Sequence, residues 1–321
     1  MKRIGLLLVV LIAILGAGAF MVNGALGEAT IEEETPFLIP AGSSLTSVAG
    51  QLEAEGLISS ADGFLLRARL FGSSDPIQAG EFSLTPGMDQ AAILRAFQSG
   101  DVIRRFVTIP EGMPSILVQE RLMATELLTG EIEVPAEGSI LPDTYSYERG
   151  ATRASLIERM QEAMDKALAE EWAKRGPNTA VDNIRDAVTL ASIVEKETGV
   201  PEERRMVAGL YSNRVRTGML LQADPTIIYP ITKGKPLGRR IRRSEIAAVN
   251  GYNTYTRVGL PVGPITNPGR ESIAAVLNPA ETSVLFMVAD GTGGHKFAVT
   301  NEEHNANVEE WYKLRRERGE M

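Results

Sequence analysis

The chain has 321 residues, of which 44% are hydrophobic, and a net charge of −8 with two histidines and no cysteine. This length exceeds one ordinary domain and supplies enough apolar material for two. The acidic balance argues against a general nucleic-acid-binding protein. The absence of cysteine excludes disulfides, thiolate metal sites and cysteine nucleophiles, so stability must come from packing.

A membrane anchor is the first predicted element. Residues 4–26 carry no charge, and the run exceeds the roughly 20 residues that a helix needs to cross a bilayer. Two basic residues precede it and several glutamates follow it, so the N-terminus should stay in the cytoplasm. We predict a single-pass transmembrane anchor over residues 1–27, a tether over residues 28–36, and the rest on the outer, periplasmic side of the inner membrane. A cleaved signal peptide is the alternative, because residues 17–19 resemble a cleavage site.

The next region predicts a first subdomain over residues 37–105. Its hydrophobic spacing alternates between strand and helix periods, and Gly100 is suited to end the last helix. The predicted elements are a strand at residues 37–39, a helix near 45–57, a helix at 61–71, a strand at 80–84 and a helix at 88–99. This order is βααβα.

The second region predicts a larger domain over residues 106–315. Residues 107–113 repeat the strand and Ile-Pro-x-Gly turn that begin at residue 37. A long amphipathic helix is predicted over residues 153–175, after a loop at 141–145. Residues 286–299 predict two strands joined by a tight turn. Helices mixed with short strands indicate an α+β fold.

A helix over residues 184–198 carries a carboxylate at an apolar position. At about 100° per residue, Leu190 and Val194 belong to a broad apolar arc that also includes Glu195, whereas Glu197 falls with Thr189 on the polar side. A carboxylate on an apolar face loses hydration, which favours its protonated form and suits general acid catalysis. The alternative is a structural glutamate paired with an arginine at the helix end.

Four segments after this helix are rich in Asn, Gln, Asp, Tyr and turn residues: 211–214, 221–226, 252–255 and 259–269. Sugar hydroxyls require amide and carboxylate partners, and sugar faces stack on aromatic rings. Each segment alone is typical of an ordinary turn, but the four together favour a carbohydrate cleft. The candidate substrate-binding residues are Asn213, Gln222, Asp224, Tyr252, Asn253, Thr254, Tyr255 and His295.

Other chemistries find little support in the sequence. His295 and His304 lie nine positions apart, which matches no metal-binding motif, so no metal is expected. Residues 291–296 lack the spacing of a phosphate-binding loop, and no Gly-x-Ser-x-Gly elbow occurs. We expect no cofactor. The basic residues between 233 and 243 predict a solvated loop, with an anionic polymer or a lipid head group as the alternative contact.

Six motifs, in chain order, resemble the endolytic murein transglycosylases of the MltG (YceG-like) family. They are Ala191–Thr198 (ASIVEKET), Gln222–Thr226 (QADPT), Tyr252–Tyr255 (YNTY), Gly259–Pro261 (GLP), Pro268-Gly269, and Gly293–His295 (GGH) with His304-Asn305. The resemblance implies an N-terminal membrane helix, a LysM-like subdomain near residues 37–85 and a catalytic domain. It also implies that Glu195 is the catalytic glutamate. The loop at residues 233–243 is more basic than the family pattern.

The resemblance implies cleavage of the β-1,4 bond between N-acetylmuramic acid and N-acetylglucosamine in nascent peptidoglycan strands. The product would end in 1,6-anhydro-N-acetylmuramic acid, and elongation of the strand would stop. The enzyme would act alongside the peptidoglycan synthases. One carboxylate suffices because the nucleophile is a hydroxyl of the substrate, and no second carboxylate shares the apolar face with Glu195. A hydrolytic muramidase and a noncatalytic peptidoglycan-binding anchor are the alternatives.

Overall fold

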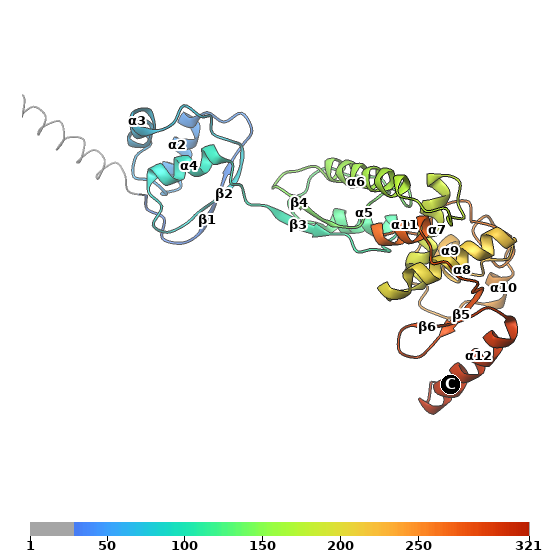
Figure 1. The fold of residues 1–321 in the computed structure, drawn as a ribbon. Coiled ribbons are helices and arrows are strands. Elements are labelled where there is room, and N and C mark those ends of the chain that lie inside the picture. The colour runs from blue at the N-terminus through green and yellow to red at the C-terminus, as the bar shows by residue number, and fades with distance from the viewer. Residues whose placement is uncertain (1–28, 321) are drawn as a thin grey trace, which may run out of the picture. The chain divides into compact units, whose positions relative to one another are not determined.

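The computed structural model describes residues 29–320, and Figure 1 labels their elements. The chain divides into two compact units, one up to Arg105 and one from Phe106 onward. Within residues 29–320, no helix is both long and apolar enough to cross a membrane. The predicted anchor over residues 1–27 lies outside the described residues.

The first unit has the predicted βααβα order. Its elements are β1 (Thr35–Ile39), α2 (Leu45–Ala54), α3 (Ala61–Phe71), β2 (Gly80–Leu84) and α4 (Gln90–Ser99). Side chains cap the helices: Ser44, Ser60 and Asp89 accept hydrogen bonds from backbone N–H groups in the first turns. The strands β1 and β2 pair antiparallel. In the core, the rings of Phe37 on β1 and Phe82 on β2 pack against the ring of Phe97 on α4.

The second unit is mainly helical. Its elements are β3 (Arg105–Thr108), α5 (Ser115–Ala124), β4 (Thr144–Tyr147), α6 (Arg153–Ala173), α7 (Ile184–Glu197), a 3-10 turn (Pro201–Glu203), α8 (Arg204–Thr217), α9 (Pro225–Thr232), α10 (Arg243–Ile246), α11 (Arg270–Leu277), β5 (Phe286–Ala289), β6 (His295–Ala298) and α12 (Asn301–Glu317). Strands β3 and β4 pair, as do β5 and β6, so the sheets are two-stranded. The mixed α+β class is confirmed, and α7, α8 and α11 enclose the main core.

Two predicted segments differ from the structure. Residues 211–214, expected in a loop, lie inside α8, because apolar residues such as Val207 and Leu210 continue helical spacing on both sides of Gly209. Residues 144 and 145, also expected in a loop, begin β4. Local composition favours a turn at both places, but burial against neighbouring elements decides the outcome.

The repeated turn does form twice. In each copy a strand ends at an Ile-Pro-x-Gly turn with the glycine in the left-handed region, Gly42 at φ +82° and Gly112 at φ +69°, and a helix follows. The residue after each glycine donates a backbone hydrogen bond to the proline carbonyl, at 3.1 and 3.2 Å. The second copy contacts α7, because its Gly112 lies against the side chains of Glu195 and Lys196.

Candidate active site

Helix α7 carries the two candidate glutamates at its C-terminal end. The Asn183 side chain caps the helix by accepting a 2.9 Å hydrogen bond from the Asp186 N–H. Every residue from Ala187 to Val194 is buried, and the helix packs against α8 and α11. Ile184, at the same angular position as Glu195, is exposed because it lies in the first turn, beyond the core. A rigid, buried helix therefore positions both carboxylates.

Glu195 is held by donors from the start of α11. Its Oε2 atom accepts hydrogen bonds from the Gly269 backbone N–H at 2.9 Å and from the Ser272 hydroxyl at 2.7 Å. Its Cγ atom lies against Gly112, where an added Cβ would come within 3.4 Å. Two donors on one oxygen fix the position of the carboxyl group and restrict its rotation.

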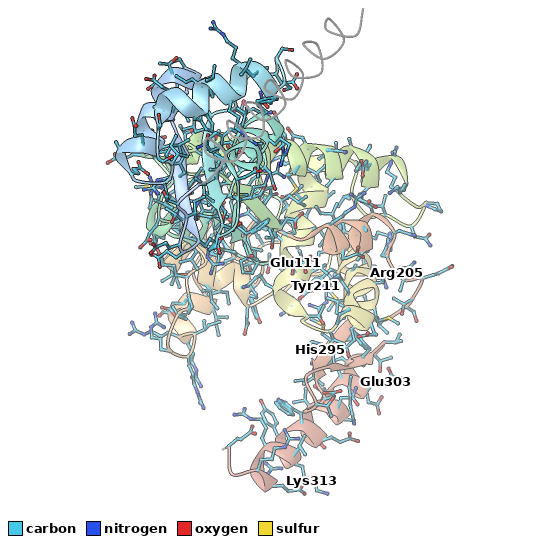
Figure 2. The ribbon with its side chains drawn as sticks, turned by 90° about the vertical axis from the view of Figure 1, so that its left-hand side faces the viewer. Glu111, Arg205, Tyr211, His295, Glu303 and Lys313 are labelled. Carbon is cyan, nitrogen blue, oxygen red and sulfur yellow. The ribbon has the colours of Figure 1, made fainter. Side chains whose placement is uncertain are left out.

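A second acidic group lies beside Glu195. Burial raises the pKa of Glu111, and the nearby charge of Glu195 raises it further, while the Arg204 guanidinium, 3.6 Å from Glu111, opposes the shift. Glu111 belongs to the repeated turn, so it comes from a part of the sequence far from α7. Figure 2 labels Glu111 and Tyr211. Glu111 lies outside the helical pattern of α7, so the sequence did not point to this neighbour.

Glu197 does not face solvent as the helical wheel predicts. Burial raises its pKa to about 7, and the charge of Asp224 adds to the shift, whereas a hydrogen bond with the Tyr211 side chain and the charge of Arg214 oppose it. Thr189, on the same arc, is 2% exposed. The wheel is correct about which residues share an arc, but on this arc Glu197 meets Tyr211 of α8 and Asp224 before α9, whereas Lys196 is exposed.

The loops at residues 222–226 and 252–255 lie together, as predicted. The Tyr255 hydroxyl donates a 2.6 Å hydrogen bond to Asp224, and the hydroxyls of Thr226 and Thr254 lie 2.8 Å apart. Their charged and hydroxyl groups reach Glu197: the charges of Asp224 and Glu197 interact, and burial together with Asp224 raises the pKa of Tyr255. The loops therefore meet α7 at Glu197.

Several predicted substrate-binding residues make hydrogen bonds within the protein. The Asn213 amide donates to the carbonyls of Thr282 and Val284. The Asn253 amide donates to three carbonyls at residues 245, 246 and 248, and its side chain is fully buried. Thr254 is also buried, and its hydroxyl accepts from the Ala223 N–H.

The remaining predicted residues are more accessible. Gln222 is exposed with φ +52°, and its backbone N–H donates to Thr254. The Tyr252 ring is half-buried, 4.8 Å from the Tyr229 ring. His295 lies on β6, where its ring Nδ1 and backbone N–H both contact Glu203 at 2.8 Å; Figure 2 labels it.

Two buried polar residues of α8 line the Glu197 site; they lie in the segment 211–214 that the sequence favours for the cleft, but they were not among the predicted substrate-binding residues. Tyr211 is 2% exposed and hydrogen-bonded to Glu197. Arg214 is 7% exposed; its guanidinium donates to the carbonyls of Leu221 and Leu285 and lies over the Tyr211 ring. Their spacing of three residues on one helix was the available signal, because such residues share a face.

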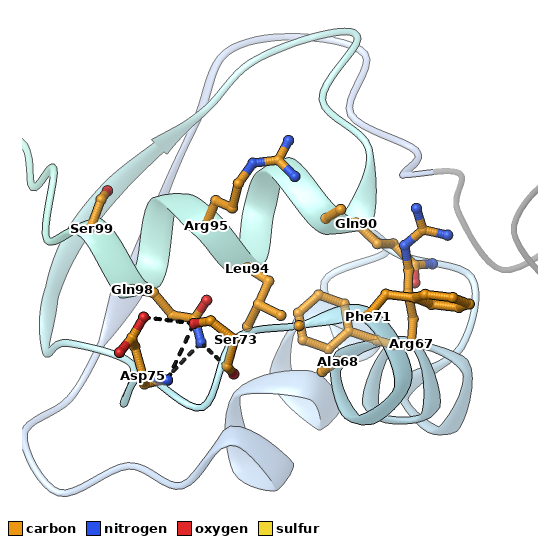
Figure 3. Close-up of a pocket in the computed structure, with 13 residues that line it drawn as sticks. Arg67, Ala68, Phe71, Ser73, Asp75, Gln90, Leu94, Arg95, Gln98 and Ser99 are labelled. Carbon is orange, nitrogen blue, oxygen red and sulfur yellow. Dashed lines mark hydrogen bonds between the residues drawn. The ribbon is translucent and has the colours of Figure 1, made fainter.

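The first unit has a hollow of its own, between α3 and α4. It has a volume of about 540 Å³ and is lined by Phe64, Arg67, Phe71, Gln90, Leu94, Arg95 and Gln98, among others (Figure 3). The Gln98 amide closes one end by donating to the carbonyls of Ser73 and Asp75. Asp75 is the one carboxylate among its lining residues, and it is exposed.

Comparison with known proteins identifies the family. The model of the YceG-like family matches residues 37–310, which includes both units and the whole of the candidate site. The chain belongs to the YceG-like family. Its sequence is 26% identical to an endolytic murein transglycosylase of Bacillus subtilis, over 94% of this chain and 92% of the relative.

Other YceG-like relatives extend the comparison. An endolytic murein transglycosylase of Streptococcus pneumoniae is 29% identical over 85% of this chain, which spans 57% of that relative's length. The crystal structure of a YceG-like protein from Listeria monocytogenes shares 27% identity, covers 85% of this chain and 99% of its own, and superposes with a TM-score of 0.53. The recognition made from the six motifs is confirmed.

Proposed function

We propose that this protein is an endolytic murein transglycosylase that cleaves peptidoglycan strands and leaves 1,6-anhydro-N-acetylmuramic acid ends. Relatives named for this activity match both units of the chain. The observation that carries the chemistry is Glu197, whose pKa is raised to about 7 and which is bordered by tyrosine hydroxyls and the carboxylate of Asp224, groups suited to sugars.

The mechanism needs one carboxyl group that transfers a proton twice. The acid form protonates the glycosidic oxygen, and the bond from that oxygen to C1 of muramic acid breaks. The resulting carboxylate then takes the proton of the C6 hydroxyl, whose oxygen bonds to C1 and closes the anhydro ring. A carboxyl group with a pKa near the working pH exchanges its proton efficiently in both directions. The reaction consumes no water molecule.

Two glutamates compete for this role, and we favour Glu197. Its pKa of about 7 leaves a substantial protonated fraction at neutral pH, and its neighbours Asp224 and Tyr255 come from the predicted sugar-binding loops. Glu195, which the family resemblance assigns, is the second candidate. Its two donors on Oε2 suit a carboxylate that orients the start of α11.

Conservative substitutions of each glutamate test the proposal. Glu197→Gln keeps the shape but removes the transferable proton, so the rate of anhydro-end formation should fall by about a hundredfold or more, as expected for lost acid–base catalysis. Glu195→Gln should cost less, and Glu302→Gln, at an exposed position of α12, should change nothing. Mass spectrometry of digested, un-crosslinked glycan strands measures the product, because anhydro ends are lighter than reducing ends by one water.

Two outcomes would redirect the proposal. Reducing ends from the wild-type protein would replace transglycosylation with hydrolysis. If Glu195→Gln lost all activity while Glu197→Gln lost little, the proton transfer would be assigned to Glu195.

We also propose that residues 1–27 anchor the enzyme in the inner membrane and that the first unit is a LysM-like subdomain that binds glycan. The charge-free run at residues 4–26 supports the anchor, and the βααβ order of β1, α2, α3 and β2 supports the subdomain. An anchored enzyme would meet nascent strands near the peptidoglycan synthases. N-terminal sequencing of the membrane-extracted protein tests this, and a mature start near residue 20 would contradict the anchor.

A further inference from the structure

A small cavity lies beside the end of α7 and is not used in the proposed proton transfer. Its volume is about 310 Å³, and Lys196, Pro225, Tyr229, Lys235, Leu237 and Thr266 are among its lining residues. Lys196 lies between the two candidate glutamates in sequence, and Pro225 follows Asp224 directly. The cavity therefore adjoins the candidate active site within the same compact unit.

One buried hydroxyl in the cavity wall has no partner. Thr266 is 1% exposed, and its Oγ1 atom forms no hydrogen bond within the described residues. A buried hydroxyl without a partner costs free energy, so such groups are rare unless a ligand or an ion satisfies them. Lys235, which also lines the cavity, is engaged: its ammonium group pairs with Glu120.

An available cation lies at the cavity rim. Lys196 is exposed, and the one hydrogen bond that its ammonium group makes among the described residues is a long contact, 3.4 Å, to the Gly112 carbonyl. It forms no ion pair with a described carboxylate, although Glu195 and Glu197 are its neighbours in sequence. A lysine ammonium with spare donors suits a carboxylate ligand.

The apolar part of the wall limits what can bind. Ile228, Leu237, Ile265 and the ring of Tyr229 contribute apolar surface, and 310 Å³ is at the lower end of ligand pockets, which span about 300–1,000 Å³. This volume is too small for several sugar rings. It suits a short acyl or peptide chain with a carboxylate that reaches Lys196.

We propose that this cavity binds the first residues of the peptide substituent on muramic acid, with Lys196 pairing with a peptide carboxylate and Thr266 donating to a peptide carbonyl. This inference rests on the proposed function, because that function requires a muramic acid residue beside the glutamates. The cavity then selects strands that carry peptides and helps to set the position of the scissile bond.

The first test varies the charge of the peptide. Wild-type protein should cleave strands whose peptide carboxylates are free with about tenfold higher kcat/KM than strands with the same carboxylates amidated, the ratio expected for one charge-assisted hydrogen bond of about 1.4 kcal/mol. Lys196→Met should bring that ratio close to one. Arg240→Met removes an exposed cation of the neighbouring basic loop that does not line the cavity, and should leave the ratio unchanged. Equal loss on both substrates in Lys196→Met would overturn the proposal.

The second test separates binding from folding. Thr266→Val removes the unpartnered hydroxyl, so stability to urea should not fall, but KM for peptide-bearing strands should rise severalfold with kcat retained. A residue with only a structural role would give the opposite pattern, lower stability with unchanged KM.

Direct binding makes the two proposals distinguishable. N-acetylmuramoyl tripeptide, titrated calorimetrically, should bind the wild-type protein and bind Lys196→Met at least fivefold more weakly. If the wild type makes anhydro ends but binding of this probe does not depend on Lys196, the cavity proposal alone fails. If the wild type makes no anhydro ends from any strand, the proposed function fails first.

Discussion

Glu195 and Glu197 differ in their surroundings although they lie two positions apart on α7. Hydrogen bonds from Gly269 and Ser272 satisfy the first, whereas the second lies in a buried, partly acidic environment that raises its pKa to about 7. The environment of a carboxyl group, and not its residue type, decides whether it can hold a proton at neutral pH.

The raised pKa of Glu197 predicts a pH dependence of activity. A general acid must be protonated, so kcat/KM should fall as pH rises through about 7, approaching about tenfold per pH unit above it. The pH profile of anhydro-end formation checks this. A profile that stays flat from pH 6 to 9 would argue against Glu197 as the acid.

The same shift predicts an effect on stability. The folded protein holds the proton of Glu197 more tightly than the unfolded chain does, so its stability falls as pH rises from about 4.5 through about 7. The shift corresponds to at most about 3 kcal/mol. Glu197→Gln should therefore raise the melting temperature relative to wild type at pH 8.5 and much less at pH 4.5. Calorimetry at both pH values makes the comparison, with Glu302→Gln as the control.

At the scale of elements, loops of the site are fixed by side chains that sequence reasoning assigned to the substrate. Asn253 ties together the segment after α10, and its carbonyl oxygen accepts from the Tyr255 N–H. Thr254 joins this segment to the loop before α9. Tyr255 and Asp224 meet Glu197 because these internal bonds bring the two loops together.

Loss of the Asn253 amide should therefore act through stability. Asn253→Ala removes a fully buried side chain together with its hydrogen bonds to three backbone carbonyls and from the Tyr255 N–H. Each such bond contributes about 0.5–1.5 kcal/mol, so the free energy of unfolding should fall by at least about 2 kcal/mol. Urea denaturation measures the change. Asn305→Ala, exposed on α12, serves as the control and should be within about 0.5 kcal/mol of wild type. An Asn253→Ala protein with unchanged stability and a raised KM would instead support the predicted role of Asn253 in substrate binding.

The two repeated turns provide a matched pair of substitutions. Gly42→Ala and Gly112→Ala both place a side chain at positive φ, which costs about 1 kcal/mol. A Cβ on Gly42 meets nothing within 4 Å, whereas one on Gly112 contacts Glu195 and Lys196. Both variants should lose similar stability, but only Gly112→Ala should lower activity. Equal activity in the two variants would show that α7 tolerates displacement at this turn.

At the scale of the whole molecule, each unit has a hydrophobic core made from its own residues. The core of the first unit ends with Phe97, and the cores of the second begin at Val107. Units with separate cores can fold independently. The candidate site and the peptide-binding cavity belong entirely to the second unit.

The second unit alone should therefore fold and act. Residues 106–321 should unfold in one cooperative calorimetric transition. They should also produce anhydro ends from soluble strands at a rate within about tenfold of that of the full-length protein, because no group of the proposed proton transfer is lost. Aggregation of this fragment would indicate that its fold depends on the first unit.

The sequence by itself determined the order of elements in the first unit, the repeated turn, the α+β class and the family. These features depend on local periodicity, capping and short motifs, which are properties of neighbouring residues. It also indicated that the two polar loops accompany one helix. Tertiary structure alone decided that Glu197, on the polar arc of α7, meets Tyr211 and Arg214 of α8, and that the amides of Asn213 and Asn253 bond to backbone carbonyls. Whether a polar side chain meets a sugar, a backbone carbonyl or another acid depends on what packs against it, and those partners come from distant parts of the chain.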